Sequence, residues 1–153
     1  MKKVLKLCAG VAALGMLAGF GGCGLIGGGD TTDVFSLKVG DCVDVSGLGD
    51  LVSKLPTMAC TEPHNGEIYY IFNLPDGTFD EDANWDATVE ECMRTIDEYV
   101  GPNWDQVSSQ GLEPGAITPV AETWAKGDRE VICYVGTVSG DMELTSSVKG
   151  LGR

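Results

Sequence analysis

Histidine and basic side chains are scarce in this sequence. Among its 153 residues there is one histidine, His64, and ten lysines and arginines face 23 aspartates and glutamates, giving a net charge of −13. Because an acidic surface repels phosphate backbones, the composition excludes nucleic acid as a partner. Solubility is the ordinary explanation of this charge, and a cationic partner is the alternative. A Ser-His-Asp triad is excluded unless it uses His64.

The N-terminus has the pattern of an export signal. Met1–Lys6 contains three lysines, Leu7–Phe20 is apolar and uncharged, and Gly21-Gly22-Cys23 follows. This order is typical of a secretory signal, and a cysteine after two small residues resembles a bacterial lipobox, in which Cys23 is acylated and begins the mature protein. An uncleaved anchor of about 20 residues and plain secretion are the alternatives. All three place the rest of the chain outside the cytoplasm.

The expected organisation is a signal peptide at 1–22, a flexible tether at 23–33 and one domain at 34–153. The glycine-rich composition of 24–32 is typical of a flexible tether. The three signal lysines leave with the signal, so seven basic residues then face 23 acidic ones. With Cys23 acylated, the domain is expected at the cell membrane, lipid-anchored on its extracytoplasmic face.

The sequence contains neither a phosphate-binding loop motif nor a C-x-x-C zinc motif. The glycines at 27–29 are not followed by the Lys-Ser/Thr of a phosphate loop. Since Cys8 lies in the signal and Cys23 is the lipid site, four cysteines remain, separated by 18, 32 and 41 positions, which is too far for a C-x-x-C zinc motif. An even number of cysteines in an exported domain predicts two disulfides among Cys42, Cys60, Cys92 and Cys133. Spacing alone leaves all three pairings open.

Several segments have the pattern of β-strands. Glu67–Leu74 and Arg129–Thr137 are rich in β-branched and aromatic residues, which favour strands. The apolar residues of 35–39 alternate with polar ones, which predicts a strand that continues at 42–45. A further strand is expected at 57–61.

One long helix is expected between these strands. Apolar residues recur there at spacings of 4, 3, 4 and 3, which is one face of an α-helix: Trp85, Val89, Cys92, Ile96 and Tyr99. Asp82 or Asn84 can cap its start, and Gly101-Pro102 ends it. Short helices are expected at 104–108 and 119–124. The fold class is therefore α+β, a small antiparallel sheet packed against one main helix and held by two disulfides.

The order of several short blocks resembles the septum-formation domain of actinobacterial membrane proteins and lipoproteins. The blocks are Gly40-Asp41-Cys42, the run Cys60-Thr61-Glu62-Pro63-His64-Asn65-Gly66-Glu67, a helix with Cys92, Pro119–Trp124, Gly127–Cys133 and Ser147–Gly150. The resemblance covers about residues 36–151. It implies an extracytoplasmic, disulfide-bearing domain of the cell envelope with a link to division. It also favours the pairs Cys42–Cys60 and Cys92–Cys133.

His64, Glu62 and Glu67 form one group of candidate contact residues. The spacing H-x-x-E could hold a divalent metal if another ligand came from elsewhere. The alternative is a turn between strands in which His64 bonds to nearby backbone.

A second group of candidates surrounds Arg129. Asp128 and Arg129 are expected to form a structural ion pair, or Arg129 to bind a carboxylate such as Glu62. Trp85 is expected in the core and Trp124 at a contact surface. The acidic segment 76–82 lacks the calcium-loop spacing and is expected to be a solvated loop and helix cap.

These features predict a noncatalytic binding or scaffold module of the cell envelope. No catalytic residue, metal or cofactor is expected. The expected partners are the membrane, through the lipid anchor, and an envelope protein or polymer that the sequence does not identify. The alternative is an envelope enzyme or metal-dependent hydrolase using His64.

Overall fold

The computed structural model describes residues 30–49, 51–141 and 143–153. The expected signal peptide and Cys23 lie outside these residues, as does most of the expected tether. Six antiparallel strands form one sheet in the order β1-β3-β2-β4-β6-β5. Their bounds are β1 Asp30–Asp33, β2 Cys42–Val43, β3 Lys54–Met58, β4 Gly66–Asn73, β5 Leu112–Ile117 and β6 Glu130–Thr137.

The central pair, β4 and β6, confirms the two strongest strand predictions. The two strands pair from Gly66–Gly136 at one end to Asn73–Glu130 at the other. The register shifts between Ile68 and Tyr70, as a β-bulge does. Ile68 and its neighbour Tyr69 are both buried, and they pack in different apolar clusters because successive side chains of a strand point to opposite faces of the sheet.

The predictions near the N-terminus need correction. The strand expected at 35–39 is wrong, because the Asp33 side chain accepts a hydrogen bond from the Phe35 N–H and starts the 3-10 turn η1 (Val34–Ser36). Strand β1 lies in the C-terminal part of the expected tether and pairs with β3. Strand β3 begins at Lys54 rather than Thr57. Strand β5 was not predicted, because Pro114 and Gly115 weaken its pattern.

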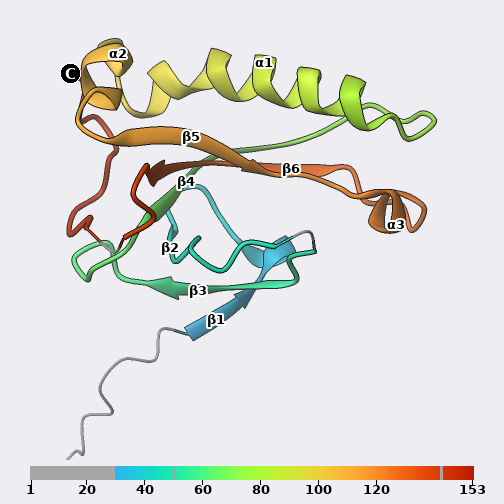
Figure 1. Ribbon diagram of the computed structural model, residues 1–153, viewed down its shortest axis with the longest axis horizontal. Helices are drawn as coiled ribbons and strands as arrows, with labels where there is room; N and C mark the ends of the chain where they lie inside the picture. Colours follow the sequence, from blue (N-terminus) through green and yellow to red (C-terminus); the bar gives the residue numbers. More distant parts are fainter. Residues whose placement is uncertain (1–29, 50, 142) are drawn as a thin grey trace, which may run out of the picture.

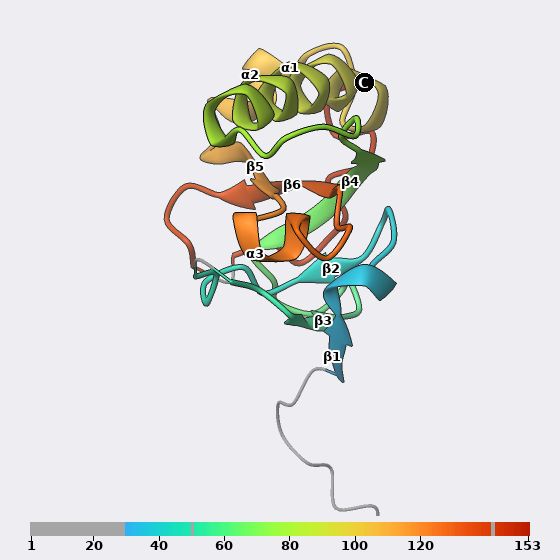
Figure 2. The same cartoon turned by 90° about the vertical axis from the view of Figure 1, so that its right-hand side faces the viewer.

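The main helix, α1 (Glu81–Tyr99), confirms the helix prediction but not its cap. The side chain of Asp80, rather than Asp82 or Asn84, caps the helix by accepting the Ala83 N–H at 3.0 Å. The chain turns away at Gly101, whose φ of +124° favours glycine. Helices α2 (Trp104–Ser108) and α3 (Ala121–Trp124) confirm the two short helices. Figures 1 and 2 place α1 and α2 on one side of the molecule and β1 on the opposite side.

Only the C-terminal half of the expected apolar stripe on α1 is buried. Ile96 is 1 % exposed, whereas Trp85 and Val89 are 51 % and 42 % exposed. The expectation of Trp85 in the core is therefore wrong. The N-terminal half of α1 lies beside β5, which is an edge strand, so no further strand of the described residues covers these side chains.

Two apolar clusters lie on opposite faces of β6. Val131, Cys133 and Val135 pack in the cluster that contains the buried face of α1, and Ile132 packs in the other. The bridge Cys92–Cys133 ties α1 to β6, and Cys42–Cys60 ties β2 to the segment after β3. The α+β class, the two disulfides and the pairing implied by the family resemblance are thus confirmed. No helix in the described part of the chain is long and apolar enough to cross a membrane.

Candidate functional site

The His64–Glu67 segment leads from a turn into β4 and is buried. The side chains of His64, Asn65 and Glu67 are each 0 % exposed. The backbone of His64 bonds in both directions with Leu144, at 2.9 and 3.0 Å. His64 Nδ1 lies 2.8 Å from the Glu62 carbonyl oxygen. The prediction of a turn in which His64 bonds to nearby backbone is therefore confirmed.

Asn65 connects two other segments to the start of β4. Its Oδ1 accepts the Val45 N–H at 2.7 Å, and its Nδ2 donates to the Gly140 carbonyl at 2.9 Å and to Asp44 Oδ1 at 3.1 Å. A buried amide with these partners holds the segment after β2 against the segment after β6. Asn65 is thus a structural residue.

Glu67 makes the corresponding connection to α1 and the C-terminal segment. Its Oε1 accepts hydrogen bonds from the Tyr99 hydroxyl at 2.5 Å and from Ser147 Oγ at 2.7 Å, and its Oε2 accepts the Val148 N–H at 2.7 Å. Burial and the bond to Glu67 raise the pKa of Tyr99, so this hydroxyl remains a donor. Three donors compensate the carboxylate for the water that it loses on burial.

The surface role expected for His64 and Glu67 does not fit these contacts. Both side chains lie in the interior, whereas Glu62 is exposed. The structure does bring His64 and Glu67 together, as the spacing H-x-x-E suggested. Cys42 Sγ, one ring nitrogen of His64 and one carboxylate oxygen of Glu67 lie within 4.8 Å of one another. Cys42 is bonded to Cys60 in this arrangement.

Arg129 fixes the turn before β6. Its NH1 nitrogen donates to the carbonyls of Trp124 at 2.9 Å and of Asp128 at 2.6 Å, and its guanidinium lies 3.7 Å from the centre of the Trp124 ring. Its ion pair is with Asp76, at 3.1 Å, rather than with the expected Asp128 or Glu62. Trp124 is 6 % exposed, so the expectation of Trp124 at a contact surface is wrong.

A groove of about 410 Å³ lies beside this turn, between β1, η1 and the 48–53 segment on one side and β5, α3 and β6 on the other. We name it the acidic groove. Apolar side chains of the second cluster form much of its interior, among them Val34, Leu48, Val52, Ile117 and Ile132. Phe35 and Leu51, which are 60 % and 61 % exposed, lie at its opening.

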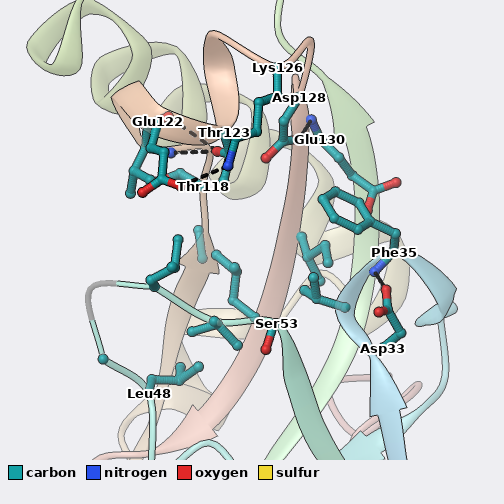
Figure 3. A pocket seen from close by; sticks show the side chains of 18 residues that line it. Asp33, Phe35, Leu48, Ser53, Thr118, Glu122, Thr123, Lys126, Asp128 and Glu130 are labelled. Atoms are coloured by element: carbon teal, nitrogen blue, oxygen red, sulfur yellow. Dashed lines mark hydrogen bonds and ion pairs between the residues drawn. The ribbon is translucent and has the colours of Figure 1, made fainter.

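Carboxylates outnumber cations around the acidic groove. Asp33, Glu122, Asp128 and Glu130 line it with one basic residue, Lys126, which is already paired with Glu122 at 2.7 Å. Figure 3 shows Glu122, Lys126, Asp128 and Glu130 together along one side of the groove, with Leu48 and Ser53 across from them. The groove therefore combines apolar walls with excess negative charge.

Glu130 is the carboxylate in the least favourable environment of the groove. Burial and the neighbouring Asp128 raise the pKa of Glu130, because both disfavour its charged form. Asp128 instead accepts the Glu130 N–H at 3.0 Å. A cation bound near these two carboxylates would offset the repulsion between them.

Sequence reasoning found Asp128 and Arg129 but not the groove beside them. Asp33, Phe35, Leu51 and Glu130 come from distant parts of the chain, and only the fold brings them together. Two signals were present in the sequence. Asp128 and Glu130 are two positions apart at the start of a predicted strand, so their carboxylates are expected on the same face. The strand predicted at 35–39 has one apolar face, and a partner for that face would have had to be sought.

The comparisons with known proteins assign the family. The model of the family described as Septum formation matches residues 24–144. This chain belongs to the septum formation family. No curated protein and no solved structure matches. The match to the septum formation family contains the whole acidic groove and the His64–Glu67 segment, but it ends before Ser147 and Val148, which bond to Glu67.

Proposed function

We propose that this protein is a lipid-anchored, noncatalytic binding module of the cell envelope that acts in septum formation. In this proposal the acidic groove takes a short segment of an envelope protein that carries an apolar side chain beside a lysine or arginine. The family supports the connection with septum formation. The proposed acylation of Cys23 rests on the sequence pattern, and would hold the groove near other envelope components.

The carboxylate pair Asp128–Glu130 carries the argument for a cationic segment. Folding places Glu130 in a partly buried position beside a like charge, which costs stability unless a cation binds there. The apolar interior supplies area for an adjacent side chain, and the exposed Phe35 and Leu51 add apolar surface beside it. Apolar contact and charge complementarity together select one chemical class of partner.

The alternative of a hydrolase using His64 is weaker. A catalytic base must reach its substrate, and the His64 side chain is 0 % exposed and turned toward the Glu62 carbonyl. We therefore expect no hydrolysis when the purified protein is screened on envelope polymers and esters, with and without divalent metal. Turnover that disappears in His64→Ala would replace the binding module with an enzyme.

Site-specific photocrosslinking in living cells tests the groove. A photoreactive phenylalanine analogue replaces Phe35 in the full chain, and the matched control replaces Glu90, which is exposed on α1. We expect position 35 to crosslink to a protein segment that contains lysine or arginine, and Asp128→Lys/Glu130→Lys to abolish that product. The same products from both positions, or a product unaffected by the charge reversal, would contradict the groove as the binding site.

The anchor has a separate test. Cys23→Ser should block acylation, so the protein should leave the membrane fraction or accumulate as a precursor. Normal processing with unchanged membrane attachment would exclude the lipoprotein proposal. The crosslinking test keeps Cys23 and reads out the partner, whereas the anchor test changes Cys23 and reads out membrane attachment, so the failure of one can be told from the failure of the other.

A further inference from the structure

The buried cluster of Cys42, His64 and Glu67 has the chemistry of a metal site that the disulfide closes. One donor atom from each of the three side chains lies within 4.8 Å of the other two. In a tetrahedral zinc site, bonds of 2.0–2.3 Å place neighbouring donor atoms roughly 3.3–3.8 Å apart. Starting from separations of no more than 4.8 Å, the donor atoms need to approach one another by at most about 1–1.5 Å to share one ion. Their donor set of thiolate, imidazole and carboxylate suits zinc.

His64 is held as a metal-binding histidine is. Because the Glu62 carbonyl can only accept, Nδ1 carries the proton and donates it, at 2.8 Å. The lone pair is then on Nε2, and this nitrogen is buried with no hydrogen-bond partner among the residues that the structure describes. Metal-bound histidines commonly donate their second N–H to a backbone carbonyl in this way. An orphaned buried acceptor is costly in a folded protein, and a bound ion would account for it.

Glu67 keeps capacity for one more contact. Its Oε1 already accepts two hydrogen bonds, but its Oε2 accepts one, from Val148. A carboxylate oxygen has two lone pairs, so Oε2 can accept a metal without losing an existing partner.

The disulfide withholds the third ligand. Cys42 is 1 % exposed and its sulfur is bonded to Cys60, which is partly exposed. A dithiol reductant can attack Sγ of Cys60, so that the sulfur of Cys42 leaves as a thiolate. The second thiol of the reductant then releases Cys60 and is itself oxidised to a disulfide. Two electrons pass to the protein, and a free Cys42 thiolate remains beside His64 and Glu67.

We propose that opening the Cys42–Cys60 disulfide converts this cluster into a zinc site with Cys42, His64 and Glu67 as ligands, and with Cys60 available as the fourth. Zn²⁺ binding displaces the thiol protons and satisfies His64 Nε2. The disulfide of the oxidised protein ties β2 to the segment after β3, whereas the metal of the reduced protein would tie β2 to His64 and to Glu67 on β4, so Cys42 is cross-linked in both states. This site is separate from the acidic groove and does not rest on the proposed function.

Cys60→Ser tests the site without any reductant, because it leaves Cys42 as a permanent free thiol. The full chain carries Cys8→Ser and Cys23→Ser in every variant, so neither cysteine competes for metal. We expect about one zinc per chain in Cys60→Ser and none in the oxidised parent. The matched control is Cys92→Ser, which frees Cys133 in an apolar cluster and should bind no zinc.

Cobalt substitution and a second variant identify the ligands. Co²⁺ in Cys60→Ser should show thiolate-to-metal charge-transfer absorption. Adding His64→Gln should weaken zinc binding at least tenfold, with retained circular dichroism showing that the chain still folds. If that variant does not fold, zinc X-ray absorption on Cys60→Ser should show sulfur and imidazole ligands. A folded Cys60→Ser that takes no zinc, equal zinc in the Cys92→Ser control, or a spectrum without imidazole would overturn the proposal.

Discussion

Glu67 and Glu130 lie at opposite ends of the same pair of strands and in opposite environments. Glu67 on β4 is opposite Val135, and Glu130 on β6 is opposite Asn73. The carboxylate of Glu67 is fully buried and accepts three hydrogen bonds, whereas Glu130 is partly buried beside Asp128 and the pKa of Glu130 is raised by both. The comparison teaches that a buried carboxylate with enough hydrogen-bond donors stabilises the fold. A partly buried carboxylate without such donors is a candidate for binding a cation.

The largest expected loss of stability follows from replacing Glu67, the glutamate whose carboxylate accepts three hydrogen bonds. Glu67→Ala leaves the Val148 N–H and the hydroxyls of Tyr99 and Ser147 without their acceptor, so we expect a loss of about 3–5 kcal/mol in the free energy of unfolding. Urea unfolding measures it. Glu62→Ala, on an exposed carboxylate nearby, should change stability by no more than about 0.5 kcal/mol. Equal midpoints for the two variants would remove the structural role of Glu67.

The second largest loss of stability is expected from replacing Asn65, whose neutral side-chain amide makes several hydrogen bonds. Asn65→Ala removes the acceptor of the Val45 N–H and the donor to the Gly140 carbonyl, both at partly buried positions. We expect a loss of about 2–3 kcal/mol, measured by urea unfolding. Asn73→Ala, at an exposed position on the same strand, is the control and should be close to neutral. If both variants unfold alike, the Asn65 contacts do not stabilise the protein.

Replacing Arg129 tests whether its contacts stabilise the turn before β6, which lies beside the acidic groove. Arg129→Ala loses two carbonyl contacts and the stacking on Trp124, and should lower stability by about 1–2 kcal/mol. Asp76→Ala is the matched control, because the Asp76 side chain is 94 % exposed and such an ion pair contributes little. A loss in Asp76→Ala as large as in Arg129→Ala would make the ion pair the stabilising contact.

The smallest expected effect has the opposite sign. The pKa of Glu130 is raised in the folded state, so its ionised carboxylate destabilises the folded protein. This destabilisation is fully present above the folded-state pKa. It is lost as the pH falls below the ordinary pKa of 4.5. Glu130→Gln should therefore raise the urea midpoint at pH 7 and leave it unchanged at pH 4. Glu67→Gln should lower the midpoint at pH 7. Two changes of the same sign would break the comparison between the two glutamates.

Local pattern was enough for the elements at the centre of the molecule. Strands β4 and β6 and helix α1 were predictable because each has a long periodic or β-branched run. The irregular edges were not. β5 contains Pro114 and Gly115, and η1 forms in a segment whose alternation resembles a strand because one Asp33 side-chain bond favours a turn. Even α1 was predicted with the wrong cap.

The candidate site was less predictable than the fold. The sequence suggested His64, Glu67 and Trp124 as contact residues, but their burial depends on partners that are remote in the chain. Glu67 receives a hydrogen bond from Val148, 81 positions later. The acidic groove joins residues from Asp33 to Ile132. No local pattern contains such information.

The sequence by itself determined the α+β class, the acidic charge, the main helix, the central strands and the cysteines available for two bridges, because these follow from composition and short-range periodicity. Only the tertiary structure decided that Trp85 is exposed and Trp124 buried, and that Glu67 accepts three hydrogen bonds in the interior whereas Glu130 is partly buried beside Asp128. The physical reason is that the free energy of a polar or aromatic side chain depends on what packs against it. In this protein those neighbours come from other strands, an edge of the sheet and the C-terminal segment.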